Sequence, residues 1–438
     1  MNLALLLLLC TQVDPPTKTQ EIPHAGLARA FVERLGRGEF DQAVASFDDT
    51  MKRGLPASKL REVWQGITGQ YGPLQSLGES RREVVDKYQV VFVTLEFARG
   101  KLEAKVVFDS QDRIAGLFFV PAGKYKSPAY VDTTKFSEVE VKVGKGLFPL
   151  AGTLSLPTGD GLFAAVVLVH GSGPHDRDET IGPNRPFRDL AQGLASQGIA
   201  VLRYEKRTKQ HQLVMALTTS TITVKEETVN DAAAAVETLA GQEKIDPNRI
   251  FVLGHSLGGM LLPRIAAANP RPAGFISLAG STRPLEDLVL EQTKYILLLD
   301  GPLNAEKQQQ LNVIKQQVDK VKSADLSIDT PARELPLGVA ARYWLDLRDY
   351  DPAAAAQRIA RPMLILQGER DYQVTMDDFA RWKQAIGSRN QVKFVSYPTL
   401  NHLFMVGAGP SRPIEYLTPG NVAESVIRDV AQWIKSSR

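Results

Sequence analysis

Residues 249–259 read RIFVLGHSLGG, an apolar run that passes directly into a serine flanked by glycines. The run is typical of a buried strand, and the apolar residues after Gly259 are typical of a helix. Glycine two residues before and after a serine, between a strand and a helix, indicates a sharp turn that lifts the serine out of a sheet. We predict that Ser256 is a nucleophile and that the Leu257 amide, at the start of the helix, faces a developing oxyanion.

A glycine-rich turn follows an earlier apolar run, residues 164–169, and reads HGSGP over residues 170–174. Backbone amides of such a turn approach a negative oxygen closely, because glycine carries no side chain. We expect the amide of Gly171 or Ser172 to supply the second donor of an oxyanion hole, beside that of Leu257. The other residues predicted to line the substrate site are His170, Gly173 and His255.

The candidate acids follow a later apolar run, residues 363–366, which leads into QGERD at 367–371. An acid in a loop after a strand can orient a histidine and stabilise its cation. Both Asp371 and Glu369 are carboxylates in this loop, and Asp371 is the first choice.

The candidate base follows the last apolar run, residues 392–397, which leads into PTLNH and ends at His402. The order nucleophile, acid and histidine along the chain separates this pattern from other serine triads. We predict that His402 takes the proton of Ser256 and that Asp371 holds the imidazole in the required tautomer.

Residues 134–438 as a whole alternate short apolar runs with helical segments, which favours an α/β class with a doubly wound, mainly parallel sheet. An insertion with helical composition, at about 282–350, is too long for a plain connection and is predicted to form a helical cap. The strand candidates are residues 164–169, 199–204, 249–253, 274–278, 363–366 and 392–397.

Residues 21–122 are predicted to form a separate small α+β domain. Three amphipathic helices at 25–35, 40–51 and 58–71 are expected to precede an antiparallel sheet. Its strand candidates are residues 88–97, 101–108 and 114–120.

Composition restricts the function classes. The chain has 438 residues, 43% hydrophobic content and a formal net charge of +3, which is typical of a globular protein and leaves no basic stripe for nucleic acid. The one cysteine, Cys10, and the absence of zinc-ligand spacing predict no metal, and we expect no organic cofactor. Residues 1–20 are interpreted as a signal segment and linker, because residues 1–10 read MNLALLLLLC, an apolar run about as long as the core of a signal peptide. The run is too short to span a membrane. We expect export to the periplasm or medium, and a cytoplasmic location is left open.

These motifs together resemble the bacterial α/β-hydrolases of the esterase D-like group. The resemblance is carried by HGSGPHDR (170–177), DETIGPNRPFRD (178–189), GHSLGG (254–259), QGERDYQV (367–374) and the pair Asn401-His402. It implies carboxylesterase activity on short acyl chains and an acid three residues after a glycine, which favours Asp371. The N-terminal domain is similar to the cystatin-like or nuclear-transport-factor-like domains that precede some bacterial hydrolases.

The sequence therefore predicts a serine carboxylesterase that hydrolyses short to medium acyl esters of small molecules through an acyl-enzyme. A peptidase or amidase, or a thioesterase or acyltransferase, would use the same three residues and stays open. A binding protein without catalysis is a further alternative. A homo-oligomer is also left open.

Overall fold

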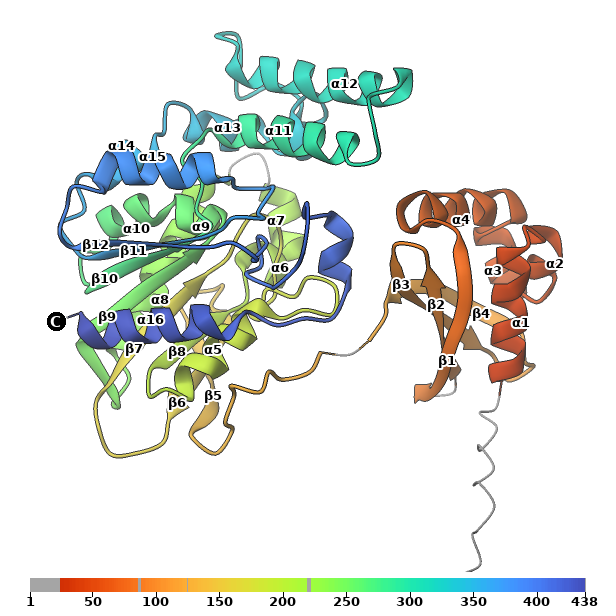
Figure 1. The fold of residues 1–438 in the computed structure, drawn as a ribbon, viewed down its shortest axis with the longest axis horizontal. Helices are drawn as coiled ribbons and strands as arrows, with labels where there is room; N and C mark the ends of the chain where they lie inside the picture. Colours follow the sequence, from red (N-terminus) through yellow and green to blue (C-terminus); the bar gives the residue numbers. More distant parts are fainter. Residues whose placement is uncertain (1–23, 86–87, 124, 219–221, 438) are drawn as a thin grey trace, which may run out of the picture. The chain divides into compact units, whose positions relative to one another are not determined.

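The computed structural model describes residues 24–85, 88–123, 125–218 and 222–437, and the predicted signal segment and linker at 1–20 lies outside them. The chain divides into two compact units, Met1–Ala122 and Gly123–Arg438 (Figure 1). No helix within the described ranges is long and apolar enough to cross a membrane.

The first unit packs helices on one face of a four-stranded antiparallel sheet. Its strands follow the order β1-β2-β3-β4. Strand residues such as Val93 and Val106 are buried, and so are Phe31 and Leu60 of the helices. The elements are α1 (Ala25–Gly36), α2 (Phe40–Ala45), α3 (Asp49–Gly54), α4 (Ala57–Tyr71), β1 (Leu74–Val85), β2 (Tyr88–Phe97), β3 (Gly100–Phe108) and β4 (Ile114–Pro121).

Two expectations for this unit are corrected. The helix predicted at 40–51 is two helices, because Phe47 forms a β-bridge with Ile114 and Asp48 begins a new helix by accepting a hydrogen bond from the Met51 amide at 2.7 Å. The strand β1 was not predicted, since its sequence LQSLGESRREVV is mostly polar; it forms the edge of the sheet and pairs only with β2.

The second unit contains an eight-stranded sheet in the order β12-β11-β10-β9-β7-β8-β6-β5. The neighbours from β12 to β8 pair in parallel, and β5 and β6 add an antiparallel edge. This antiparallel edge was not among the predicted strands. The strands are β5 (Phe136–Val143), β6 (Leu150–Pro157), β7 (Phe163–Val169), β8 (Ala200–Tyr204), β9 (Ile245–His255), β10 (Gly274–Leu278), β11 (Met363–Gly368) and β12 (Val392–Tyr397).

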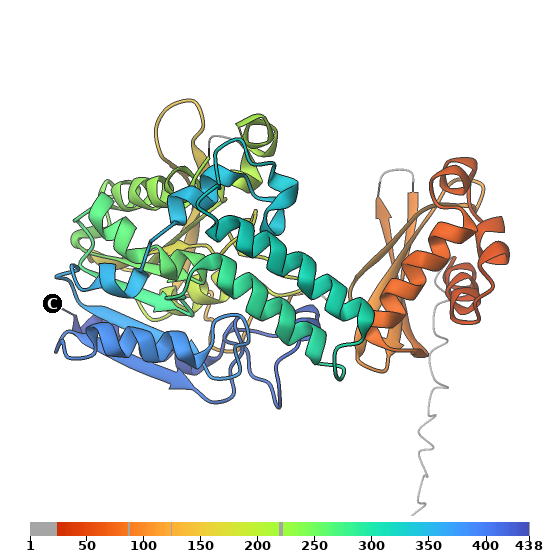
Figure 2. The same cartoon turned by 90° about the horizontal axis from the view of Figure 1, so that it is seen from above.

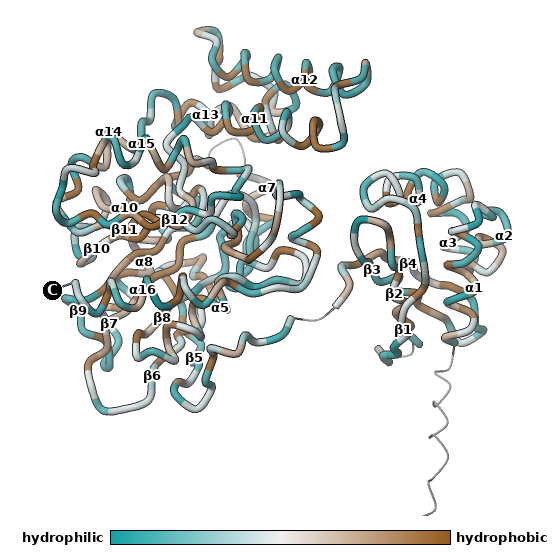
Figure 3. The backbone as a smooth tube through the Cα atoms, viewed as in Figure 1, coloured by the Kyte–Doolittle hydropathy of each residue, from teal (hydrophilic) through white to brown (hydrophobic). Residues whose placement is uncertain are grey.

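Helices cover both faces of this sheet, and its middle strands are hydrophobic (Figure 3). The helices α5 (Pro186–Ala195) and α16 (Glu424–Ser436) pack on one face. The other face is covered mainly by α8 (Asn230–Ala240), α10 (Leu262–Ala268) and α15 (Met376–Ile386). The sheet is thus buried on both faces, which explains the continuous apolar runs of its parallel strands.

A helical insertion separates β10 from β11, and its helices α11 (Leu285–Leu298) and α12 (Ala305–Lys322) run side by side (Figure 2). Trp344 of α13 (Ala341–Leu347) is buried against Val321 of α12. The shorter elements of the unit are α6 (Arg207–Gln210), α7 (Gln212–Thr218), α9 (Leu257–Met260), α14 (Pro352–Ala356), the π-helical turn η1 (Lys225–Val229), and the 3-10 turns η2 (Ala332–Glu334), η3 (Pro336–Gly338) and η4 (Pro413–Leu417).

Candidate active site

Ser256 lies at the sharp turn between β9 and α9. Its backbone angles are φ 53° and ψ −116°, a conformation that costs energy for any residue with a side chain. The two flanking glycines make the turn feasible: a Cβ on Gly254 would lie 2.2 Å from the Gly258 carbonyl oxygen, and one on Gly258 would lie 2.3 Å from that of Val169. The sequence motif is therefore a steric requirement of this turn.

Asp371 and His402 follow the neighbouring strands β11 and β12 and form a buried pair. His402 Nδ1 lies 2.6 Å from Asp371 Oδ2, and the two residues are 4% and 5% exposed. The other carboxylate oxygen, Oδ1, accepts hydrogen bonds from the amides of Gln373 and Val374 at 2.7 and 3.0 Å. With the Nδ1 proton directed at Asp371, the opposite nitrogen of His402 can accept a proton.

The structure separates the two carboxylates that the sequence left open. Glu369 Oε1 accepts a hydrogen bond at 2.8 Å from the hydroxyl of Ser396, which lies on the adjacent strand β12. Asp371, in contrast, contacts His402. Within the described ranges, His402 is hydrogen bonded to Asp371 but not to Ser256. The acid and base are thus brought together, and the contact from base to nucleophile is not formed.

A second buried pair, which the sequence did not predict, lies beside the first. His255 Nδ1 is 2.9 Å from Glu179 Oε2, and His255 Nε2 donates to the carbonyl oxygen of His402 at 3.0 Å. The other oxygen of Glu179 accepts the Gly171 amide at 2.7 Å. Through His255 and Glu179, the glycine-rich turn is therefore joined to the backbone of the candidate base.

The charge of Glu179 favours the protonated form of His255. Its Nε2 donates to a carbonyl oxygen, and its Nδ1 lies within ion-pair distance of the Glu179 carboxylate, without the alignment of a hydrogen bond. Burial opposes the charge, but the carboxylate of Glu179 outweighs burial and raises the pKa of His255. Burial likewise opposes ionisation of Glu179, and the charge of His255 nevertheless lowers the pKa of that carboxyl.

Two of the residues predicted to line the substrate site, His170 and His255, are buried. His255 makes the contacts described above, and His170, 2% exposed, donates from Nε2 to the Asp176 carbonyl oxygen at 3.0 Å. Burial lowers the pKa of His170 to about 3, so its ring is neutral and packs against Phe187. Both histidines therefore pack beside the candidate site, and their contact with substrate stays a prediction.

The oxyanion candidates are also distinguished by their contacts. The Gly171 amide is already paired with Glu179, whereas Ser172 and Gly173 line a cavity of about 720 Å³. Leu257 is the first residue of α9, where backbone amides have no carbonyl partner within the helix. The arrangement therefore favours Ser172 over Gly171 as the partner of Leu257.

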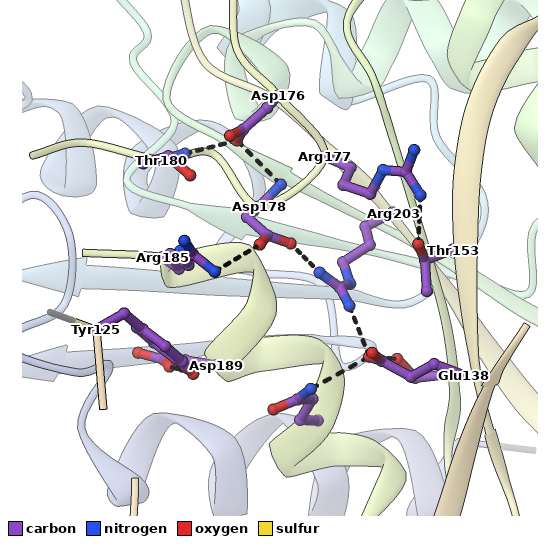
Figure 4. A network of polar contacts seen from close by, with 12 residues as sticks. Tyr125, Glu138, Thr153, Asp176, Arg177, Asp178, Thr180, Arg185, Asp189 and Arg203 are labelled. Carbon is purple, nitrogen blue, oxygen red and sulfur yellow. Dashed lines mark hydrogen bonds and ion pairs between the residues drawn. The ribbon is translucent and has the colours of Figure 1, made fainter. Parts of the chain in front are cut away.

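A network of charged side chains holds the loop that follows β7 (Figure 4). Buried Arg203 bridges Asp178 and Glu138, the latter at 2.6 Å. Arg177 donates to Thr153 Oγ1 at 2.6 Å, and Asp176 accepts from the Thr180 amide at 2.9 Å. Asp176, Arg177 and Asp178 therefore stabilise the loop that contains Glu179.

Asp189, at the end of the stretch 178–189, joins α5 to the chain before α16. It accepts a hydrogen bond from the Tyr125 hydroxyl at 2.7 Å and one from the Val422 amide at 2.9 Å. Burial raises the pKa of Asp189 to about 6. In the part of the chain that the structure describes, no group of three histidine, cysteine or acidic side chains could hold a metal.

Family profiles match both units. Residues 28–117 match a family described as a protein of unknown function, DUF3887, and residues 162–407 match the family described as serine aminopeptidase, S33. The first match agrees with the expected nuclear-transport-factor-like domain. The second spans more than half of the chain and defines the class: the protein is an α/β-hydrolase, as predicted.

Individual relatives place the chain more narrowly. It is 39% identical over 406 residues to Esterase EstD from Thermotoga maritima, covering 92% of this chain and 93% of the relative. Similar solved structures include the Pyrococcus furiosus esterase PF2001, with 16% identity and a TM-score of 0.43, which covers 69% of this chain and 91% of that one. Another is Est1E from Butyrivibrio proteoclasticus, with 16% identity and a TM-score of 0.43, which covers 68% of this chain and 99% of that one. The chain belongs to the family of Esterase EstD, which confirms the expected group and the prediction of an esterase-type hydrolase.

Proposed function

We propose that the protein is a serine carboxylesterase in which Ser256, His402 and Asp371 act as nucleophile, base and supporting acid. The observation that carries the proposal is the convergence at one sheet edge of the Ser256 turn and the 2.6 Å contact between His402 and Asp371. The name of the relative, Esterase EstD, supports ester hydrolysis.

The chemistry follows from the roles of these three residues. His402 Nε2 takes the hydroxyl proton of Ser256, and the resulting alkoxide attacks the ester carbonyl. The amides of Leu257 and Ser172 stabilise the negative oxygen of the tetrahedral intermediate. The C–O bond to the alcohol then breaks, the alcohol leaves with the proton from His402, and water releases the acid from Ser256 by the same steps.

Hydrolysis of p-nitrophenyl acetate, butyrate and octanoate by the wild type and by Ser256→Ala tests the proposal. We expect turnover of at least one ester and its loss in the variant. An aminoacyl-p-nitroanilide tests the peptidase alternative, and cleavage of the anilide without any ester would favour it. A folded wild type that is inactive on all esters would contradict the proposal.

We further propose that the protein is exported, on the basis of the apolar residues 1–10. Fractionation of a producing bacterial cell tests this. Recovery in the periplasm or medium supports export, and recovery only with cytosolic markers contradicts it.

A further inference from the structure

The largest cavity beside the glycine-rich turn lies in the second unit and has a volume of about 720 Å³. This size falls within the roughly 300–1,000 Å³ typical of small-molecule sites. Its lining includes Ser172 and Gly173 of the glycine-rich turn and Leu285, Val339 and Trp344 of the helical insertion. Most of the lining is apolar.

The position of Gly171 connects this cavity with the proposed nucleophile. A Cβ on Gly171 would lie 3.1 Å from Cβ of Ser256, and the next residue, Ser172, lines the cavity. Ser256 therefore lies next to the turn whose following residues line the cavity. The inference that follows rests on the proposed esterase function.

The lining contains one carboxylate, that of Glu227, beside the uncharged polar side chains of Ser172, Thr208, Gln212 and Tyr343. Glu227 is 7% exposed, and its Oε1 lies 3.2 Å from Nζ of Lys206, which is 2% exposed. Its other oxygen, Oε2, accepts the hydroxyl of Tyr343 at 2.9 Å, and Thr208 donates to Oε1 at 3.3 Å. The charge of Glu227 is thus balanced by Lys206.

The positive charge of Lys206 is already paired with the carboxylate of Glu227. Besides Glu227, its ammonium group donates to the Gly171 carbonyl oxygen at 2.7 Å. A ligand carboxylate in the cavity would face the Glu227 carboxylate in a poorly solvated environment, and like charges repel strongly under those conditions.

We propose that this cavity binds the acyl chain of the substrate, and that the chain is uncharged, apolar and of medium length. The acyl chain is favoured over the alcohol because it stays attached to Ser256 after the alcohol departs. A cavity lined by both the insertion and the sheet domain can hold this acyl chain until water releases it. Glu227 acts as a specificity residue that rejects acyl chains with an anionic end.

The first test fills part of the cavity with a larger side chain and measures the preference for acyl-chain length. For the wild type, kcat/KM on p-nitrophenyl esters should rise up to about fourfold per added methylene from acetate to octanoate. Val339→Trp should lower kcat/KM for octanoate at least tenfold and change acetate less than twofold. The control Val313→Trp, on exposed α12 outside the cavity, should behave as the wild type. An unchanged chain preference in Val339→Trp would overturn the proposal while ester hydrolysis itself stands.

The second test uses charge and an isosteric change. The substrates are the p-nitrophenyl monoester of suberic acid, with a terminal carboxylate, and p-nitrophenyl octanoate of equal length. We expect the wild type to prefer octanoate at least a hundredfold, and Glu227→Gln to reduce this preference at least tenfold, since the charge of Lys206 then becomes available. An equal preference in both proteins would overturn the role of Glu227. If no ester is hydrolysed by the wild type, the proposed function fails instead.

Discussion

The site contains two buried histidine–carboxylate pairs that differ in what the Nε2 atom of the histidine contacts. The ring centroids of His402 and His255 lie 4.7 Å apart. Nδ1 of His402 lies 2.6 Å from Asp371, and Nδ1 of His255 lies 2.9 Å from Glu179. The Nε2 of His255 is bound to a carbonyl oxygen, whereas no such contact engages the Nε2 of His402 within the described ranges. A histidine next to a carboxylate can therefore act as a base when its second ring nitrogen is available, and it has a structural role when that nitrogen is hydrogen bonded.

The largest effect is expected from breaking the first pair. His402→Ala removes the proposed base, and Asp371→Asn leaves the imidazole in the wrong tautomer; each should lower kcat about 10⁴-fold. Steady-state kinetics on p-nitrophenyl butyrate measure the loss. Glu369→Gln is the matched control, because its carboxylate contacts Ser396, and it should stay within about threefold of the wild type.

A smaller effect is expected from the second pair, because His255 does not touch the reacting atoms. His255→Gln keeps one donor for the His402 carbonyl but loses the charge next to Glu179. We expect kcat to fall about tenfold, as is typical when a group that orients another residue is changed. A loss as large as that of His402→Ala would contradict the distinction between the two pairs.

Much of the first pair could be predicted from the sequence, and little of the second. Ser256, Asp371 and His402 each follow an apolar run that forms a parallel strand, so their common edge follows from local patterns alone. Glu179 gives no such signal. It lies in a polar loop at φ 51°, and its contact with His255, far along the chain, depends on how that loop folds back.

Other differences between prediction and structure have similar physical origins. The strand β5 was missed because its sequence FSEVEVKV has mostly exposed positions at a sheet edge. Gly171 and Ser172 could not be distinguished as amide donors, since the distinction depends on Glu179. The periodicity of hydrophobic residues indicates which residues are buried, but it does not indicate a hydrogen-bond partner that lies in another loop.

The stability of the second pair should depend on pH in a defined direction. The pKa of His255 is raised on folding, so its contribution is full below about 6.5 and is lost as pH rises through the folded value. The pKa of Glu179 is lowered, so its contribution is full above about 4.5 and is lost as pH falls through the folded value. The pair should stabilise the fold most between about pH 4.5 and 6.5.

Urea unfolding of the wild type and of His255→Gln between pH 4 and 9 measures this smaller effect. The difference in free energy of unfolding should be about 3 kcal/mol at its maximum and should decline as pH rises above 6.5. A difference that stays constant across this range would show that His255 and Glu179 do not act as a charged pair.

The most direct test of the central claim, that Ser256 is the nucleophile, is labelling of the intact protein with a fluorophosphonate followed by peptide mapping. We expect one covalent adduct, on Ser256, formed rapidly in the wild type, absent in Ser256→Ala and much slower in His402→Ala. An adduct on another residue, or a folded wild type that stays unlabelled, would contradict the account.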